Sequence, residues 1–182
     1  VKLDHAEALD KSNVLKVLSW NMAHRLEAWR TVIDSDADIA LLQEACEPPA
    51  DIASRFDVGF EPWRTGAAGN KRLWRTAVVR LSTRVRLDRI PTRPVADTAS
   101  SGISVSQPGT LTAAHVEQLE TGEKHTLVSM YATWERPRGS AASSWMYADA
   151  SAHRLISDIS ALVGRERGHR VLAAGDLNIL HG

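Results

Sequence analysis

VLKVLSWN (residues 14–21) and DIALLQE (residues 38–44) decide the fold of this chain. Apolar and polar side chains alternate in the first segment, with a β-branched bias, which is typical of a strand. The second segment contains a short continuous apolar run and predicts a buried strand. Between them, apolar residues recur at helical spacing and predict a helix over residues 24–34. The chain therefore starts with a strand–helix–strand unit.

The rest of the sequence is richer in strands than in helices. Further strands are predicted at residues 73–80, 84–90, 110–119, 125–132 and 170–175, with a short one at Ile103 and Val105. Residues 120–123 (ETGE) are typical of a hairpin turn. Apolar residues from Ala148 to Val163 predict a long amphipathic helix. This order favours the α/β class and a β-sheet sandwich with helices packed outside.

Length and composition limit the class of protein. The 182 residues favour one domain, which we expect to begin at residue 14 after a polar arm over residues 1–13. The formal net charge is zero, so the total charge does not indicate nucleic acid or an anionic membrane. Cys46 is the only cysteine, which excludes an internal disulfide and a cysteine-rich zinc site. We see no transmembrane segment or leader pattern and favour a cytoplasmic location.

Polar side chains follow several of the buried strands. The first strand ends at Asn21, the second at Glu44, and the last at Asp176, followed by Asn178. Strand ends at one rim of a sheet can converge, and Mg²⁺ takes carboxylate and amide oxygens while keeping waters for substrate phosphates. These residues therefore predict a divalent-metal site. Taken singly, Asn21 is also consistent with a strand-ending turn residue, and Asp176 with the cap of a turn.

The motifs WN (residues 20–21), LQE (residues 42–44) and GDLN (residues 175–178), in this order and each on a predicted strand, resemble those of the endonuclease/exonuclease/phosphatase (DNase I-like) superfamily. The resemblance covers nearly all of residues 14–182. It implies an α/β four-layer sandwich of two packed mixed β-sheets with outer helices. It also implies that this chain is the first part of such a domain, with the second sheet incomplete and the C-terminal part missing.

The resemblance also assigns roles residue by residue. Glu44 matches the acidic metal-binding residue, and Asn21 the asparagine that helps this site, so Mg²⁺ or Mn²⁺ is the implied cofactor. Asp176 matches the residue that prepares the attacking water, and Asn178 the residue that orients the phosphate. Tyr131 falls where some branches have a phosphate-contacting tyrosine; a core aromatic is the alternative.

These roles imply a divalent-metal-dependent hydrolase of phosphoester bonds, most simply a nuclease-type phosphodiesterase. Nucleic acid is the favoured substrate, although Ala23 stands where abasic-site endonucleases have an aspartate. A phosphatase, a phospholipase and a non-catalytic binding module that keeps the fold are the alternatives. The family's closing Ser-Asp-His motif is expected beyond residue 182, so we expect the 182-residue chain to be inactive alone. The sequence leaves the oligomeric state open.

Basic and aromatic residues outside the motifs offer two interpretations. Arg64, Lys71, Arg72 and Arg75 belong either to a phosphate-binding surface or to a solvated basic loop. Trp134 and Trp145 flank a predicted loop, where they either stack on bases or pack into the protein.

Overall fold

The structure, a computed structural model, describes residues 13–65, 72–97, 101–133, 145–163 and 170–178. The first sheet has the order β1 (Val17–Asn21), β2 (Ile39–Cys46), β3 (Trp74–Arg80). The second sheet has the order β4 (Val85–Ile90), β7 (Leu111–Gln118), β8 (Lys124–Tyr131), β9 (Arg170–Asp176). A small third sheet pairs β5 (Thr92–Pro94) with β6 (Ile103–Val105).

Both large sheets are mixed. In the first, β1 and β2 run parallel while β3 is antiparallel to β2. In the second, β7 is antiparallel to both β4 and β8, while β8 and β9 run parallel. The parallel pairs matter for the site, because the carboxyl ends of parallel partners lie at the same edge of a sheet.

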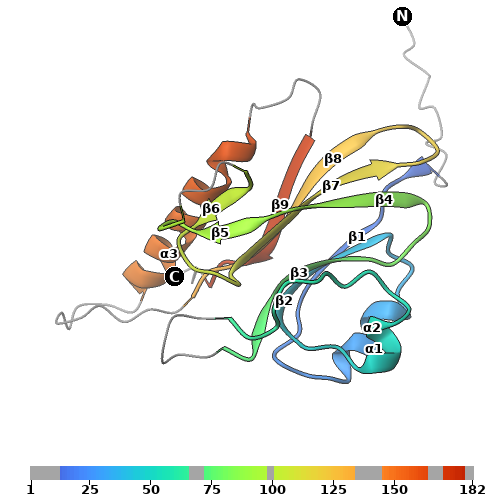
Figure 1. Cartoon of the computed structure of the whole chain (residues 1–182), viewed down its shortest axis with the longest axis horizontal. Coiled ribbons are helices and arrows are strands. Elements are labelled where there is room, and N and C mark those ends of the chain that lie inside the picture. The colour runs from blue at the N-terminus through green and yellow to red at the C-terminus, as the bar shows by residue number, and fades with distance from the viewer. Residues whose placement is uncertain (1–12, 66–71, 98–100, 134–144, 164–169, 179–182) are drawn as a thin grey trace, which may run out of the picture.

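Helices cover the two outer faces of the sandwich. α1 (Ala28–Ile33) and α2 (Ala50–Ala53) lie beside the first sheet, and α3 (Trp145–Ile159), continued by the 3₁₀ turn η2 (Ser160–Leu162), lies on the opposite side near β6 and β9 (Figure 1). This arrangement confirms the predicted four-layer α/β sandwich. That further strands complete the second sheet stays a prediction.

Three apolar clusters fill the spaces between these layers. The first includes Trp29 of α1 and Leu42 of β2, the second Leu41 and Leu127 from the facing sheets, and the third Leu155 of α3 with strand residues of the second sheet. Polar pairs also cross between the sheets. The Gln43 amide donates to Ser129 Oγ at 3.0 Å, so the two sheets are fixed by directional bonds as well as by apolar contacts.

The first predicted helix is shorter than expected. The prediction covered residues 24–34, whereas α1 comprises Ala28–Ile33. Ala23 and His24 have positive φ, at 48° and 61°, and this left-handed turn cannot be the start of a right-handed helix. The periodic apolar residues therefore marked the buried face of α1 correctly but not its beginning.

The last predicted helix is also corrected at its end. The α-helical part ends at Ile159. Ala152 and Leu155 are buried as expected, but Ile156 and Val163 are 56% and 63% exposed. Its apolar stripe is thus narrower than the sequence suggested.

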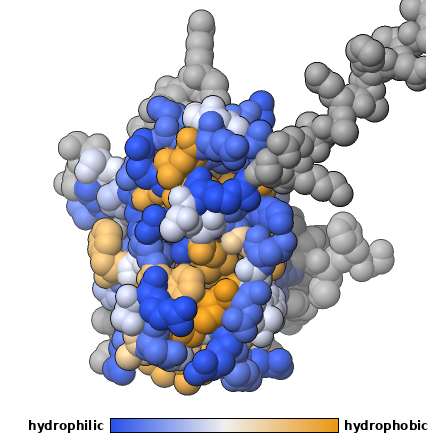
Figure 2. All heavy atoms as spheres, turned by 90° about the vertical axis from the view of Figure 1, so that its right-hand side faces the viewer, coloured by the Kyte–Doolittle hydropathy of each residue, from blue (hydrophilic) through white to orange (hydrophobic). Residues whose placement is uncertain are grey.

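The predicted arm falls almost wholly outside the described residues, which begin at Asn13. Within the described part of the chain, no helix is long and apolar enough to cross a membrane. Figure 2 shows the end of the sandwich that lies on the right in Figure 1, where β7 and β8 are joined by their hairpin. Hydrophilic residues cover most of this face and frame a smaller hydrophobic centre.

Candidate functional site

The two parallel strand pairs bring their carboxyl ends to one rim. In the first sheet Asn21 is the register partner of Gln43, the neighbour of Glu44. In the second sheet Tyr131 is the partner of Asp176. The Asn21 side-chain amide donates to Asp176 Oδ2 at 2.8 Å and so joins the two sheets at this rim.

Asp176 is held by hydrogen bonds to both of its carboxylate oxygens. Asn21 donates to Oδ2, and the backbone N–H of Asn178 donates to Oδ1 at 3.0 Å. Asn178 has φ 50°, a left-handed conformation that asparagine tolerates better than most residues. Its side-chain amide donates to the carbonyl of Ala132 at 2.7 Å. The GDLN turn thereby fixes the orientation of the Asp176 carboxylate.

Glu44 reaches the rim through an irregularity in β2. The register between β2 and β3 shifts between Leu42 and Ala45, as at a β-bulge, and Glu44 has φ 48°. Such backbone is unfavourable by about 1–2 kcal/mol for a residue with a side chain. Bulges often redirect a side chain next to an active site. The Glu44 side chain is 17% exposed, so the carboxylate is shielded but reachable.

Tyr131 lies between the two acidic residues. Burial raises the pKa of its phenol above the ordinary value, and a hydrogen bond to Glu44 and the charges of Glu44 and Asp176 add to this, while a hydrogen bond to Asn178 opposes it. The phenol therefore stays protonated at neutral pH and can donate a hydrogen bond. The structure thus brings together Asn21, Glu44, Tyr131, Asp176 and Asn178, whose catalytic and metal-binding roles stay predictions.

Two residues of this rim, His24 and Trp74, were not predicted from the sequence. His24 Nε2 lies 3.2 Å from Glu44 Oε2. The His24 ring stacks on Trp74, with ring centres 5.6 Å apart, and Trp74 meets Tyr131 edge-on at 4.7 Å. The proximity of His24 to Asn21 in sequence was the available signal, but the predicted helix start concealed it. Trp74 begins β3, a strand whose amino end lies at this rim because it runs antiparallel to β2.

Gly175 is required by the close contact of β8 and β9. A Cβ atom at this position would lie 1.8 Å from the carbonyl oxygen of Met130, its partner in the β8–β9 register. No other residue fits without a backbone shift, so the glycine before Asp176 has a structural reason.

The donor set at this rim fits a hard divalent cation. Among the described residues, no group of three or more His, Cys, Asp and Glu side chains could hold a metal ion. Mg²⁺, however, commonly uses one or two carboxylates and keeps several waters. Glu44 provides one such carboxylate, and Asn21 Oδ1, which accepts the Ala23 N–H at 2.8 Å, retains a second acceptor lone pair.

Arg75, one of the four basic residues singled out in the sequence, belongs neither to a phosphate-binding surface nor to a solvated loop. Arg75 is 3% exposed and pairs with Glu61 at 2.9 Å, with its guanidinium 4.1 Å from the Trp63 ring centre. It is therefore a structural residue, because its charge is buried and paired. A cavity of about 270 Å³ lies beside it, lined in part by Arg64 and Thr65.

Other residues of that group lie closer to the rim or outside the described part. The Arg72 guanidinium lies 5.3 Å from the Trp74 ring centre and donates to Gln107 Oε1 at 3.2 Å. Lys71 and Trp134 lie outside the described residues, as does the side chain of Trp145.

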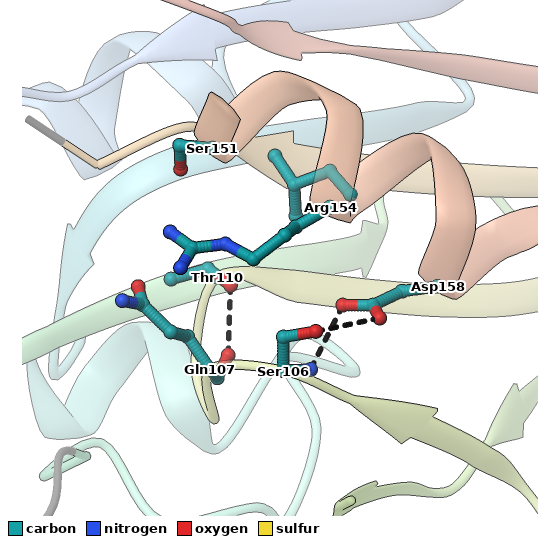
Figure 3. A pocket seen from close by; sticks show the side chains of 7 residues that line it. Ser106, Gln107, Thr110, Ser151, Arg154 and Asp158 are labelled. Atoms are coloured by element: carbon teal, nitrogen blue, oxygen red, sulfur yellow. Dashed lines mark hydrogen bonds between the residues drawn. The ribbon is translucent and has the colours of Figure 1, made fainter. Parts of the chain in front are cut away.

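A second, much smaller cavity lies between α3 and the loop before β7. Figure 3 shows Arg154 and Asp158 of α3 directed towards Ser106, Gln107 and Thr110. Asp158 accepts hydrogen bonds from the backbone N–H and hydroxyl of Ser106, both at 2.9 Å. With a volume of about 10 Å³, this space is about that of one water, and the contacts serve to hold α3 on the sandwich.

Solved structures share the fold of this chain. The endonuclease domain of TRAS1, a telomere-specific non-LTR retrotransposon, aligns with 88% of this chain and 59% of its own length at 16% identity (TM-score 0.52). A mannosyl-6-phosphatase from Bacteroides thetaiotaomicron aligns at 15% identity over 91% of this chain and 66% of its own (TM-score 0.57). The human Nocturnin catalytic domain aligns at 16% identity over 91% and 64% (TM-score 0.55). At this level of sequence identity, the structural alignments show a common fold.

The chain thus spans about three-fifths to two-thirds of the length of these structures. A search of curated proteins found no match. The model of the Endonuclease/Exonuclease/phosphatase family matches residues 18–182, from β1 to beyond the GDLN turn. This match confirms the family that the three strand-end motifs indicated, and the chain belongs to the Endonuclease/Exonuclease/phosphatase family.

Proposed function

We propose that this chain carries the metal-binding and water-activating half of a divalent-metal-dependent phosphodiesterase that acts on nucleic acid. The observation that carries the proposal is the hydrogen bond between Asn21 and Asp176, at 2.8 Å, which joins the two sheets at the rim where Glu44 also lies. Residues from strands far apart in sequence form one polar cluster, as a preorganised site requires.

In this proposal Glu44 and Asn21 hold Mg²⁺ or Mn²⁺. When bound, such an ion polarises a phosphoryl oxygen and stabilises the charge that develops on it. The carboxylate of Glu44 reaches this position from the bulge in β2, and its low exposure strengthens its attraction for a cation relative to bulk water.

Asp176 orients and deprotonates the attacking water. Its two oxygens accept hydrogen bonds from Asn21 and Asn178, so the carboxylate is fixed before substrate binds. Tyr131 remains a phenol at neutral pH, and its single proton, which faces Glu44 in the free site, turns to a phosphate oxygen when substrate binds. Each residue therefore acts on the phosphate or the water with a group that is already in place.

The surroundings of the rim support nucleic acid as the substrate. Trp74 contacts Tyr131 edge-on, and the Arg72 guanidinium lies near its ring. The His24 ring stacks on Trp74, so a base could stack only on what remains of the indole surface. An aromatic side chain beside a cation for a phosphate is typical of single-stranded nucleic-acid binding. The fold similarity to a retrotransposon endonuclease domain agrees with this choice, while the similarity to a mannosyl-6-phosphatase makes a phosphomonoester the alternative substrate.

The test compares substrates and one variant in the full-length protein. With Mg²⁺ or Mn²⁺, we expect cleavage of a single-stranded oligonucleotide and much slower release of phosphate from sugar phosphates. Glu44→Gln keeps the side-chain shape but removes the charge, and should lower the rate about 100-fold or more. Preference for the sugar phosphate would establish the phosphatase instead. Oligonucleotide binding without turnover, unchanged in Glu44→Gln, would establish the binding module.

A further inference from the structure

His24 contacts Glu44 through both its backbone and its side chain. The His24 backbone N–H donates to the Glu44 carbonyl at 3.1 Å, and Nε2 lies 3.2 Å from Glu44 Oε2. The imidazole is also stacked on Trp74, with an angle of 21° between the ring planes. Contacts with β2 and β3 thus fix the position of a ring that is 52% exposed.

The backbone that brings His24 to Glu44 is strained. Ala23 and His24 are consecutive left-handed residues, at φ 48° and 61°, and Glu44 opposite them has φ 48°. Each is unfavourable by about 1–2 kcal/mol for a residue with a Cβ. Such conformations persist where the surrounding contacts determine them, and they cluster at functional sites. Here the strained residues are His24 and Glu44, which contact each other, and Ala23, which precedes His24.

We propose that His24 is a positioning residue that orients the Glu44 carboxylate for the divalent cation. This inference rests on the proposed function. An Nε2–H of His24, 3.2 Å from Glu44 Oε2, donates to that carboxylate oxygen and restricts rotation of the Glu44 side chain. Hydrogen-bond partners of metal ligands have this effect generally, and their loss lowers metal affinity about 10–100-fold.

The structure offers a matched pair of substitutions. Because Ala23 and His24 are both left-handed and exposed, glycine at either position relieves the same kind of backbone strain. Only His24→Gly also removes the contact with Glu44. A purely structural role for His24 predicts that the two variants behave alike towards metal.

The experiment measures Mn²⁺ binding by electron paramagnetic resonance of the free ion, without substrate, alongside thermal melting. Ala23→Gly should melt at or above the wild-type temperature and bind Mn²⁺ as the wild type does. His24→Gly should bind Mn²⁺ about 10-fold or more weakly without losing its fold. Asparagine tolerates left-handed backbone but is too short to reach Glu44, so His24→Asn should show the same loss of Mn²⁺ affinity. If His24→Gly is unfolded at the temperature of the measurement, His24→Asn provides the test.

Glu44→Gln separates this inference from the proposed function. If the His24 variants bind Mn²⁺ as tightly as the wild type, or more tightly, the positioning role of His24 is overturned, while Glu44 remains the proposed metal ligand. If the wild type binds no Mn²⁺, or Glu44→Gln binds it equally well, the proposed metal site itself fails.

Discussion

Two clusters of charged residues in this chain are built on opposite principles. Beside β3, Arg75 meets Glu61 at 2.9 Å and Arg89 of β4 meets Asp57 at 2.6 Å, so each buried cation has its own carboxylate. At the strand-end rim, by contrast, Asp176 is held by neutral amide groups. Paired charges stabilise a loop on the sandwich, whereas a carboxylate oriented without neutralisation remains available to a cation or a proton. The paired charges therefore have a structural role, whereas the Asp176 carboxylate is suited to a chemical one.

The comparison also extends to the backbone. The rim contains left-handed residues with side chains at Glu44 and Asn178, whereas the loop beside Arg75 uses Gly59, at φ 91°, for its positive φ. A Cβ at Gly59 would lie 2.8 Å from Glu61 Oε2 and 2.9 Å from Arg89 Nε, so the glycine also makes room for the ion pairs. Backbone strain is thus present at the rim, where residues with side chains have positive φ, and absent beside the Arg75–Glu61 pair, where glycine has it.

The largest expected effect is on stability, at Arg75. Arg75→Met leaves the carboxylate of Glu61 without its partner and should lower the free energy of unfolding by about 3–5 kcal/mol, measured by chemical denaturation. The double variant Arg75→Met, Glu61→Leu removes both charges and should recover most of this loss. A single-variant loss below about 1 kcal/mol, the range of a surface pair, would contradict the structural role.

The next effect is on turnover, at Asp176. Asp176→Asn should lower the rate of the full-length protein about 100-fold or more while melting stays near that of the wild type. Asp158→Asn is the matched control, because Asp158 also accepts two hydrogen bonds but lies on α3. It should weaken the fold and leave turnover per folded molecule unchanged. Equal turnover in both variants would remove Asp176 from the reaction.

Asp176 and Arg75 also show what could be predicted from the sequence and what could not. Asp176 was found because a polar group directly after an apolar strand is visible in one dimension, and the same holds for Asn21 and Glu44. Arg75 was misjudged because its burial depends on Glu61 and Trp63, which reach it only in three dimensions. His24 was missed for the same reason, since its left-handed turn is stabilised by contacts with Glu44 rather than by local propensity.

A smaller loss is expected at Gly175, the first residue of the GDLN motif. Gly175→Ala places a methyl group against the Met130 carbonyl and should lower the free energy of unfolding by about 1–3 kcal/mol, measured by denaturation. Gly122→Ala, at φ 69° and with no neighbour within 4 Å, adds left-handed backbone strain without a clash, whereas Gly175→Ala adds the clash without a positive φ. Unchanged stability in Gly175→Ala would show that β8 and β9 adjust to the methyl group.

The smallest effect concerns the proton of Tyr131. Burial first, and then Glu44, raise the pKa of this phenol in the folded protein, whereas an unfolded tyrosine ionises near about pH 10. The folded state therefore retains the proton longer, so this contribution to stability is complete below about pH 10 and is lost as the pH rises through the folded value. The ultraviolet titration of the phenolates should therefore show a step for Tyr131 that comes later than that of a tyrosine in the unfolded chain. Tyr131→Phe should remove the later step, and Glu44→Gln should move it to lower pH, since the carboxylate's hydrogen bond and charge contribute to the shift. If the step that Tyr131→Phe removes lies near about pH 10, Tyr131 is not enclosed between the acidic residues, and the contrast between the strand-end rim and the ion pairs beside β3 fails.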